Sequence, residues 1–354
     1  MTSPAPIAVD DILAAAPARV SDDQAAALAA RLYGLDCSAR LLAGERDLNF
    51  HLTCDDGRQL LLKVSNPAED PNVADFQNRA LRHIQACDPD LPVQRILASS
   101  QGALQTAVSV DGQQVLVRLF SFVEGVVLCH VAEPGEAFRQ GLGTHLARLG
   151  LALRGFFHPA AGHELLWDLK HAQRLTAMTG LIGDSETREL VRRFLGHFER
   201  FALPRLPSLR AQVIHNDLNL HNVIVDAQPP HELRNILDFG DMVHAPLIND
   251  LAVGAAYQLG ATGNPLERAL PFIAAYHRVC PLEPREQEIL FDLIATRLVL
   301  TLVITNWRAS LYPRNRAYIL RNAPSALSAL QGFAQLSRED AQDQIRQACQ
   351  QETR

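Results

Sequence analysis

The chain has 354 residues, of which 47% are hydrophobic and 20% are charged, and its formal net charge is −6 at pH 7. This length predicts one large domain or two modest ones with a sizeable apolar core. Lysine and arginine form no block, so we expect no nucleic-acid partner. No apolar run approaches the roughly 20 residues that span a bilayer, and the N-terminus lacks the basic region of a secretory signal. The six cysteines form no CxxC pair, which is typical of reduced thiols and favours a cytoplasmic protein.

The N-terminal part of the sequence alternates between helical and strand-like patterns. Residues 1–20 are rich in alanine and proline and predict a loosely ordered tail. Ser21 is a good N-cap for the acidic first turn that follows, and Gly34 lies near the end of the helix that this pattern predicts. Residues 37–64 then predict short strands, with Asp56-Gly57 as a hairpin turn.

Beyond the first strands, one more β-rich stretch gives way to a mostly helical region. Residues 73–87 have helical periodicity, and residues 93–123 predict three further strands with a second hairpin turn at Asp111-Gly112. The remaining helical patterns cover residues 135–157, 165–180, 184–201, 246–260, 265–279, 283–310 and 324–350. Only residues 214–217, 222–226 and 234–241 interrupt these helices with strand-like runs.

The order of these elements predicts an α+β fold with two lobes. A small β-rich N-terminal lobe is expected at residues 21–121, and a larger, mostly helical C-terminal lobe at residues 127–354. Residues 122–126, where the β-rich region ends, would form the hinge between the lobes.

Two polar motifs lie among the strand-like runs of the C-terminal lobe. The first is His215-x-Asp217 followed by Asn222, and the second is Asp238-Phe239-Gly240, sixteen residues after Asn222. Phosphoryl transfer needs a carboxylate beside the attacking hydroxyl and oxygen ligands for Mg²⁺. We therefore predict that Asp217 is the catalytic base and that Asn222 and Asp238 are metal ligands, brought together at one end of a hairpin.

Other interpretations of these motifs remain open. Asparagine and aspartate favour turns, so a surface turn would explain the His-x-Asp pattern alone. A metal hydrolase would use His215, Asp217 and His221 around one ion, but it would give no role to the Asp-Phe-Gly segment. A third possibility is a non-catalytic nucleotide-binding protein that retains the same fold.

The β-rich lobe offers the remaining parts of a nucleotide site. Lys63 lies among apolar strand neighbours and is predicted to hold phosphates, although a lysine in a strand is more often an edge residue. The segment from Gly44 to Asp47 lies between two expected strands, where a phosphate-covering loop or a plain hairpin turn would lie. The predicted nucleotide-binding residues are Lys63, Gly44, Arg46, Asn49, Phe122, Glu124, Asn222 and Asp238.

The sequence resembles the aminoglycoside phosphotransferase and choline kinase superfamily over residues 20 to 320. The segments GERDLNF, LLLKVSNPAED and IHNDLNLHNVIV are most similar to the hydroxylysine kinase branch. The resemblance implies a protein-kinase-like fold and a kinase that uses Mg²⁺ and ATP, with GTP as an alternative donor. It also implies a small-molecule hydroxyl acceptor, with 5-hydroxylysine as the first choice and homoserine, choline, ethanolamine or an aminoglycoside as alternatives. The oligomeric state is left open.

The resemblance also assigns supporting residues and shows departures from the family pattern. Asp250 is similar to the acid that braces the catalytic loop, and His215 is expected to support the same loop. The helix after Lys63 usually supplies a glutamate that pairs with the lysine, but here Gln77 and Asn78 are the best-placed residues, so a neutral amide or an unexpected acid would take that role. Substrate residues are expected near the base, and the candidates are Asp241, Arg297, Trp307 and Arg308.

Overall fold

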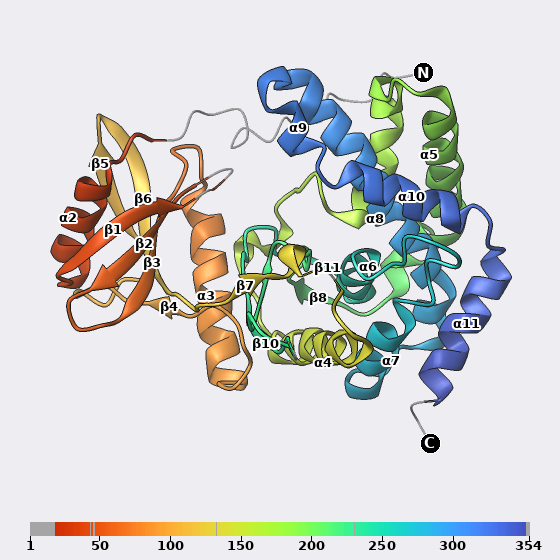
Figure 1. Ribbon diagram of the computed structural model, residues 1–354, viewed down its shortest axis with the longest axis horizontal. Helices are drawn as coiled ribbons and strands as arrows, with labels where there is room; N and C mark the ends of the chain where they lie inside the picture. Colours follow the sequence, from red (N-terminus) through yellow and green to blue (C-terminus); the bar gives the residue numbers. More distant parts are fainter. Residues whose placement is uncertain (1–17, 43, 45–46, 132, 230, 352–354) are drawn as a thin grey trace. The chain divides into compact units, whose positions relative to one another are not determined.

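The computed structural model describes residues 18–351 apart from residues 43, 45–46, 132 and 230, and its ribbon is drawn in Figure 1. The chain forms two compact units, which are described separately. Unit 1 contains the described residues up to Gly125, together with Phe156–His163 and Arg234–Gly240. Unit 2 contains Val126–Gly155, Glu164–Leu233 and the residues from Asp241 onward. The first boundary between the units thus follows Gly125, inside the segment predicted as a hinge.

Unit 1 is built on an antiparallel sheet with the strand order β1-β2-β3-β6-β4, in which β5 pairs with β6. The strands are β1 (Cys37–Leu42), β2 (Leu48–Cys54), β3 (Gln59–Val64), β4 (Ile96–Leu97), β5 (Thr106–Val110) and β6 (Gln113–Ser121). The helices of this unit are α2 (Asp22–Tyr33), α3 (Pro71–Cys87) and the short η2 (Pro159–Gly162). The strands predicted between residues 37 and 123 and both helices are therefore confirmed.

Local chemistry explains why these elements begin and end where they do. Ser21 and Gln24 form a capping box at the start of α2, and Gly34 ends the helix in a left-handed conformation with φ of 65°. Asp111 and Gly112 also have positive φ values, as the tight turn between β5 and β6 requires. Helix α2 packs against β1 (Figure 1) and helps to cover the apolar face of the sheet.

Buried and less buried side chains alternate along β3, and this alternation decides which face of the sheet Lys63 lies on. Leu60, Leu62 and Val64 are buried in the core under α2, together with Phe50 and Leu52 of β2. Successive side chains of a strand point to opposite faces, so Lys63 lies on the other face of the sheet. The apolar core thus leaves the lysine available on the face away from α2.

Two distant segments complete unit 1. The ring of Phe156 stacks on Phe76 of α3 with centroids 6.0 Å apart, and Nε2 of His158 lies 3.2 Å from a carboxylate oxygen of Asp75. Ile236 forms a parallel bridge with Val93. The bridge at Ile236 joins the segment that carries the Asp-Phe-Gly motif to the same unit as Lys63.

Unit 2 is mostly helical. Its α-helices are α4 (Glu136–Ala152), α5 (Ser185–His197), α6 (Ile248–Ala256), α7 (Leu270–Val279), α8 (Pro284–Leu311), α9 (Arg316–Ile319), α10 (Ala323–Phe333) and α11 (Arg338–Gln351). Tighter or wider turns form η1 (Leu128–His130), η3 (Leu169–Leu181), η4 (Phe198–Ala202), η5 (Leu206–Ser208) and η6 (Pro313–Asn315). Its short strands are β7 (Val126–Val127), β8 (Ala211–Ile214), β9 (Val223–Val225) and β11 (Val243–Pro246), while β10 (Leu233–Ile236) begins at the end of this unit. β7 pairs with β9, and β8 pairs with β11.

Helix α8 is the centre of unit 2. Every residue from Ile289 to Thr305 is buried, and α5, α6, η3, α10 and α11 pack against the helix. The stretch is not purely apolar, since it contains Asp292 and Arg297, which need partners in the interior.

Among the residues that the structure describes, no helix has the length and apolar character needed to cross a membrane.

Two departures of the structure from the sequence prediction have a clear physical reason. The helical pattern at residues 324–350 forms two helices, because the hydroxyl of Ser337 accepts a hydrogen bond from the Asp340 N–H at 3.0 Å and so caps a new helix. Strand β11 was not predicted, because it has four residues and ends in a proline, and its partner β8 lies far away in the sequence.

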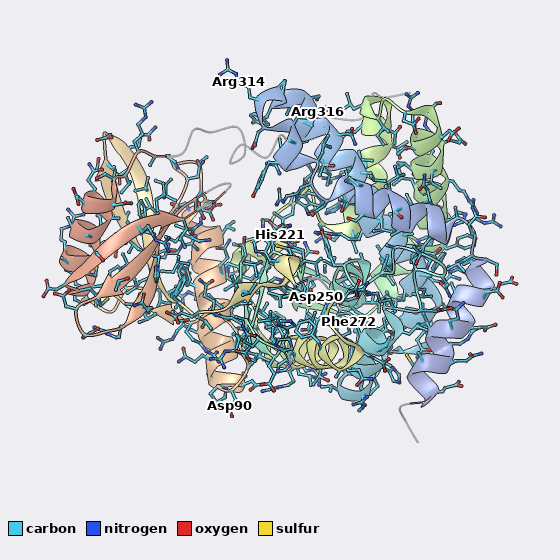
Figure 2. The ribbon with its side chains drawn as sticks, in the orientation of Figure 1. Asp90, His221, Asp250, Phe272, Arg314 and Arg316 are labelled. Atoms are coloured by element: carbon cyan, nitrogen blue, oxygen red, sulfur yellow. The ribbon has the colours of Figure 1, made fainter. Side chains whose placement is uncertain are left out.

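Helices α4 and α7 pack closely (Figure 1), and Gly143 makes this approach possible. A Cβ atom built on Gly143 would overlap with the carbonyl oxygen of Phe272, whose carbonyl carbon would lie 3.0 Å away. Phe272 is labelled in Figure 2. Because the obstacle is backbone, it has little freedom to move aside.

We expect the Gly143→Ala variant to lose about 1–3 kcal/mol of unfolding free energy, because the added methyl group forces the two helices apart. The matched control is Gly141→Ala on the same helix, where a Cβ meets nothing within 4 Å. This control should gain up to about 1 kcal/mol, since alanine is the better helix former. Urea unfolding followed by tryptophan fluorescence reports on unit 2, which contains both tryptophans. Equal changes in unfolding free energy for the two substitutions would contradict the close approach of α4 and α7 at Gly143.

Candidate active site

The loop of unit 2 that the sequence predicts to be catalytic, called the catalytic loop below, runs from His215 to Asn222, between β8 and β9, and Asp250 holds its first residues. The two carboxylate oxygens of Asp250 accept hydrogen bonds from the N–H groups of Asn216, at 2.8 Å, and His215, at 3.3 Å. Asp250 lies in the first turn of α6 and is almost completely buried. Its burial raises the pKa of the carboxyl group, while His215 and the two N–H donors act in the opposite direction.

The fixed backbone gives the loop an unusual shape. Asn216 has a φ of 65°, in the left-handed region that few residues other than glycine adopt. The next N–H group, that of Asp217, donates to Nδ1 of the buried His215 at 3.2 Å. Backbone strain of this kind persists only where neighbouring groups hold it in place, and here Asp250 and His215 supply the holding contacts.

The carboxylate of Asp217 is held from both sides. Its Oδ1 accepts a hydrogen bond from Nη2 of Arg297 at 2.8 Å. Its Oδ2 accepts one from Nδ2 of Asn219 and one from Nδ2 of Asn222, each at 2.8 Å. These three hydrogen bonds hold the carboxylate in one orientation.

Arg297 is a buried cation whose partners come from three elements. Its side chain is 3% exposed, and its guanidinium lies over the ring of Trp167 at 4.8 Å and over that of Tyr257 at 5.6 Å. The same nitrogen that contacts Asp217 also donates to the Tyr257 hydroxyl at 3.1 Å. Burial alone would lower the pKa of Arg297, but Tyr257, Asp217 and Asp241 raise it above its usual value.

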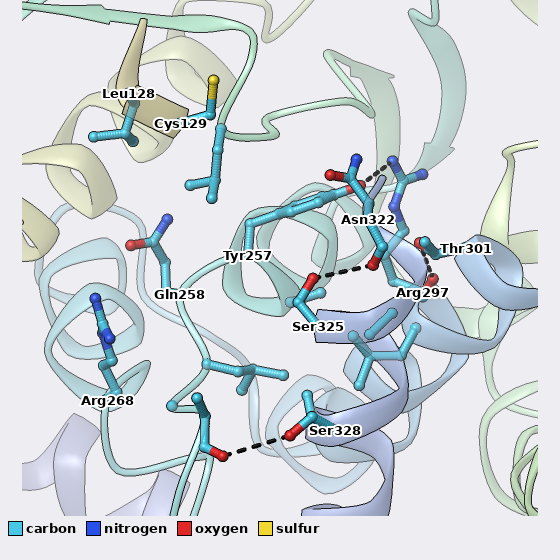
Figure 3. A pocket seen from close by; sticks show the side chains of 18 of the residues that line it. Leu128, Cys129, Tyr257, Gln258, Arg268, Arg297, Thr301, Asn322, Ser325 and Ser328 are labelled. Carbon is cyan, nitrogen blue, oxygen red and sulfur yellow. Dashed lines mark hydrogen bonds between the residues drawn. The ribbon is translucent and has the colours of Figure 1, made fainter. Parts of the chain in front are cut away.

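A pocket of about 250 Å³ in unit 2 lies beside this ion pair (Figure 3). Arg297 and Tyr257 form part of its wall, and Figure 3 shows their guanidinium and hydroxyl groups turned toward each other. Leu220 of the catalytic loop also lines it. Polar side chains on other parts of the wall include those of Glu133, Gln258, Arg268, Thr301, Asn322, Ser325 and Ser328. A small molecule in this pocket would therefore lie next to the group that holds Asp217.

The predicted substrate residues are not all brought together. Arg297 lines the pocket, whereas Asp241, Trp307 and Arg308 are not among the described residues of its wall. Asp241 is buried and acts on Arg297 through its charge. Trp307 and Arg308 are half-buried near the C-terminal end of α8, about three turns beyond Arg297.

In unit 1, the acid beside Lys63 is Asp47, which the sequence did not single out. Nζ of Lys63 lies 3.4 Å from Oδ2 of Asp47. Gln77 of α3, which was considered as a neutral partner, instead accepts a hydrogen bond from Arg118 at 2.8 Å. The partner is therefore an unexpected acid from the loop before β2, and α3 contributes a neutral amide to the neighbouring arginine.

The Asp-Phe-Gly segment also belongs to unit 1. Phe239 is buried, while Asp238 is exposed and has a φ of 57°. Oδ1 of Asp238 accepts the N–H of Gly240 at 3.0 Å, and Nε2 of Gln77 lies 3.5 Å from the Gly240 carbonyl oxygen. The buried ring and the left-handed backbone thus present the carboxylate of Asp238 at the surface of its unit.

The other predicted nucleotide-binding residues have different surroundings. Asn49 of β2 pairs in register with Lys63, and a Cβ on Gly44 would lie 2.7 Å from the Asp47 carbonyl oxygen. Phe122 packs on the ring of His51 with centroids 4.1 Å apart, and Glu124 is exposed after β6. Arg46 lies outside the described residues.

Each unit carries one predicted metal ligand, and both have an oxygen atom of the kind that Mg²⁺ prefers. No group of three or more His, Cys, Asp or Glu side chains in the described part of the chain is placed to hold a metal ion. Asn222 uses Nδ2 to bind Asp217, which leaves its Oδ1 as the atom suited to a metal, and Asp238 offers a carboxylate. Mg²⁺ typically takes one or two such ligands and completes its shell with phosphate and water.

Several residues of the site were missed in the sequence. Asp47 stands inside the segment GERDLNF that was already singled out, but its charge was not assigned a role. Tyr257 and Asn219 were also given no role, although they contact Arg297 and Asp217. Asn322, Ser325 and Ser328 come from or border α10, near the far end of the chain, and no local pattern connects them with the catalytic loop.

Comparison with known proteins gives consistent results. The model of the phosphotransferase enzyme family matches residues 38–289. Hydroxylysine kinase of Mus musculus is 27% identical over 335 residues, which cover 88% of each chain. Hydroxylysine kinase of Danio rerio is 26% identical over 345 residues, which cover 94% of this chain and 96% of the relative. A solved amicoumacin kinase in complex with AMP-PNP, Ca²⁺ and its ligand has a TM-score of 0.65 at 15% identity, over 91% of this chain and 97% of that one.

These matches confirm two predictions from the sequence. The protein-kinase-like fold is confirmed by the likeness to the solved kinase. The resemblance to the aminoglycoside phosphotransferase and choline kinase superfamily, most similar to its hydroxylysine kinase branch, is confirmed by the family match and the curated relatives.

The ion pair between Arg297 and Asp217 predicts non-additive stability effects. Either Asp217→Asn or Arg297→Met leaves an uncompensated charge, so the double variant should lose less unfolding free energy than the sum of the two losses, by about 1–3 kcal/mol. Urea unfolding followed by tryptophan fluorescence measures all of these variants.

A matched control uses a second buried pair of the same unit. Arg338 contacts Asp292 at 2.8 Å and lies over the ring of Phe201. The losses of unfolding free energy caused by Arg338→Met and by Asp217→Asn should add within about 0.5 kcal/mol, because the two sites share no partner. If the losses of unfolding free energy were additive for Asp217→Asn with Arg297→Met as well as with Arg338→Met, a coupled Arg297–Asp217 interaction would be contradicted.

Proposed function

This chain belongs to the phosphotransferase enzyme family, and we propose that it is a kinase that transfers the γ-phosphoryl group of ATP to the hydroxyl of a small amino acid or amino alcohol. GTP is the alternative donor, because the expected hinge contacts to the base are backbone groups. The metal hydrolase considered from the sequence does not fit a family of phosphotransferases.

The observation that carries this proposal is the carboxylate of Asp217. Arg297 and the amides of Asn219 and Asn222 hold it in one orientation beside a pocket for a small molecule. A carboxylate fixed in this way is suited to align an acceptor hydroxyl and to take its proton as the O–P bond forms. Asp217 is therefore assigned the role of catalytic base.

The other roles are distributed over the two units. Lys63 of unit 1 would hold the phosphates of the donor, and residues around Gly44 and Asn49 would cover them. Asn222 of unit 2 and Asp238 of unit 1 would hold Mg²⁺, which, when bound, neutralises charge on the phosphates. Asp250 and His215 hold the backbone of the loop through the hydrogen bonds described above.

The acceptor that we favour is 5-hydroxylysine. The support is the similarity to hydroxylysine kinases over nearly the whole length of both chains. The pocket adds polar groups that suit an amino acid. The hydroxyls of Thr301 and Ser325 donate to the backbone carbonyls of Arg297 and Asn322, which leaves their lone pairs to accept from an ammonium group.

Homoserine, choline, ethanolamine and aminoglycosides remain alternative acceptors. A cytoplasmic location of the protein also remains a prediction. The six cysteines are all free thiols, which is consistent with that location. The substrate-facing roles of Asp241, Trp307 and Arg308 also remain predictions.

The proposal predicts ADP release from the purified protein with Mg-ATP and 5-hydroxylysine, tested within a panel of these acceptors. Asp217→Asn should lower turnover by about 10²–10⁴-fold, because it removes the proton acceptor, while nucleotide binding measured by calorimetry is retained. The control is Asp184→Asn, which changes the exposed N-cap of α5 outside the pocket and should retain turnover.

Each outcome of this assay has a definite meaning. Turnover with a different acceptor would keep the kinase and discard hydroxylysine. Full activity of Asp217→Asn would overturn the assignment of the base. Nucleotide binding without turnover on any acceptor of the panel would count against the proposed reaction and favour a binding protein.

A further inference from the structure

Two cations lie directly opposite each other on neighbouring strands of unit 1. Lys63 of β3 pairs in register with Arg118 of β6. Residues paired in this way have their side chains on the same face of the sheet, and like charges at such positions repel. Both side chains are largely buried, with 18% of Lys63 and 2% of Arg118 exposed, so water screens this repulsion poorly. The pair therefore needs an acid nearby.

Helix α3 does not supply that acid. Its sequence, PNVADFQNRALRHIQAC, has one acidic residue, Asp75. The carboxylate of Asp75 is engaged by Arg79, at 2.6 Å, and by His158, at 3.2 Å. The residue that α3 places beside the cations is Gln77, whose amide oxygen accepts from Arg118 but brings no charge.

Asp47 supplies the missing charge from the loop before β2. Its Oδ2 lies 3.4 Å from Nζ of Lys63 and 3.9 Å from Nη2 of Arg118. Its Oδ1 accepts the backbone N–H of Asn66 at 2.9 Å, just beyond the end of β3. One carboxylate, fixed by a backbone donor, thus lies within reach of both cations.

The local chain is shaped so that Asp47 reaches this position. A Cβ on Gly44 would lie 2.7 Å from the carbonyl oxygen of Asp47 and 2.9 Å from Nδ2 of Asn49. Any larger residue would therefore push against the backbone of Asp47. The requirement for glycine at position 44 is thus partly a requirement for the placement of this acid.

We propose that Asp47 is the positioning residue of Lys63, which holds the lysine ammonium between the strands and keeps it beside Arg118 for the phosphates of the donor. This inference rests on the proposed role of Lys63 in phosphate binding. With two cations against one carboxylate, the cluster keeps an excess positive charge, as a site for a polyphosphate requires. Because the acid comes from the loop before β2, the position of the lysine does not depend on a charge carried by α3.

The composition of the chain allows a direct test. Lys63 and Lys170 are its only lysines, and Lys170 has its own acid, Asp168, at 2.8 Å. Brief acylation with an N-hydroxysuccinimide ester followed by peptide mass spectrometry therefore gives the reactivity of Lys63 against an internal reference. An ammonium group is not a nucleophile, so a lysine that loses its acid and its fixed position should react faster.

The informative variant is Asp47→Asn, because its amide oxygen can still accept the N–H of Asn66 while the charge is removed. We expect the acylation rate of Lys63 relative to Lys170 to rise about fivefold. This factor corresponds to the free energy that a partly exposed ion pair typically contributes. The matched control is Asp22→Asn. Asp22 likewise accepts a backbone N–H of the sheet, that of Leu41 at 3.0 Å, and this variant should leave the ratio unchanged. An unchanged ratio in Asp47→Asn would overturn the proposal.

A kinetic cycle separates positioning from a purely structural role. With the acceptor that supports turnover, Asp47→Asn should lower kcat on the order of tenfold, more than it changes KM for the nucleotide. In a Lys63→Met background the same substitution should have no further effect, because Asp47 acts through the lysine. Equal losses of kcat in both backgrounds would show a structural role and overturn the proposal.

Protection by the nucleotide distinguishes this inference from the proposed function. Mg-ATP should shield Lys63 of the wild-type protein from acylation and leave Lys170 unaffected. Protection of Lys63 without an effect of Asp47→Asn would overturn the positioning role alone. An effect of Asp47→Asn without protection by Mg-ATP would instead overturn the role of Lys63 in the proposed reaction.

Discussion

The site in unit 2 depends on one buried cation, the guanidinium of Arg297 in the middle of α8. A charge inside an apolar helix is costly unless charges and hydrogen-bond acceptors surround it. Asp217 supplies the opposite charge, Tyr257 supplies an acceptor, and the rings of Trp167 and Tyr257 cover the planar group. The loop that carries Asp217, the turn before η3 that carries Trp167 and the end of α6 must therefore all meet α8 at this point, so the packing that buries Arg297 also orients Asp217.

The two units use the same physical device in different ways. In each, a carboxylate from a loop holds a cation of a helix or strand: Asp217 contacts Arg297, and Asp47 contacts Lys63. A backbone hydrogen bond or a buried acid then fixes the loop itself, through Asn66 in unit 1 and Asp250 in unit 2. Because loops supply the acids, the lengths and turns of these loops matter as much as the core that supports them.

Much of the fold could be predicted because its local signals agree with the final packing. Ser21 and Gly34 mark both ends of α2, and the hairpin turns between the strands carry Asp-Gly pairs. The prediction missed β11, and it did not divide the last helical pattern at Ser337. β11 has a partner that is distant in the sequence, and a serine with an N-capping hydroxyl resembles any other serine within an amphipathic pattern.

The sequence by itself determined the family of the protein, because the motifs that suggested it are short and their spacing is set by one turn or one hairpin. His215, Asp217, Asn222 and the Asp-Phe-Gly segment could be recognised without knowing what surrounds them. Only the tertiary structure decided which side chains hold these groups. Arg297 meets Asp217 across 80 residues, Gln77 turns to Arg118, and Asp47 turns to Lys63. Such pairings depend on which buried charges must be compensated at each place in the packed fold, and no local pattern encodes that.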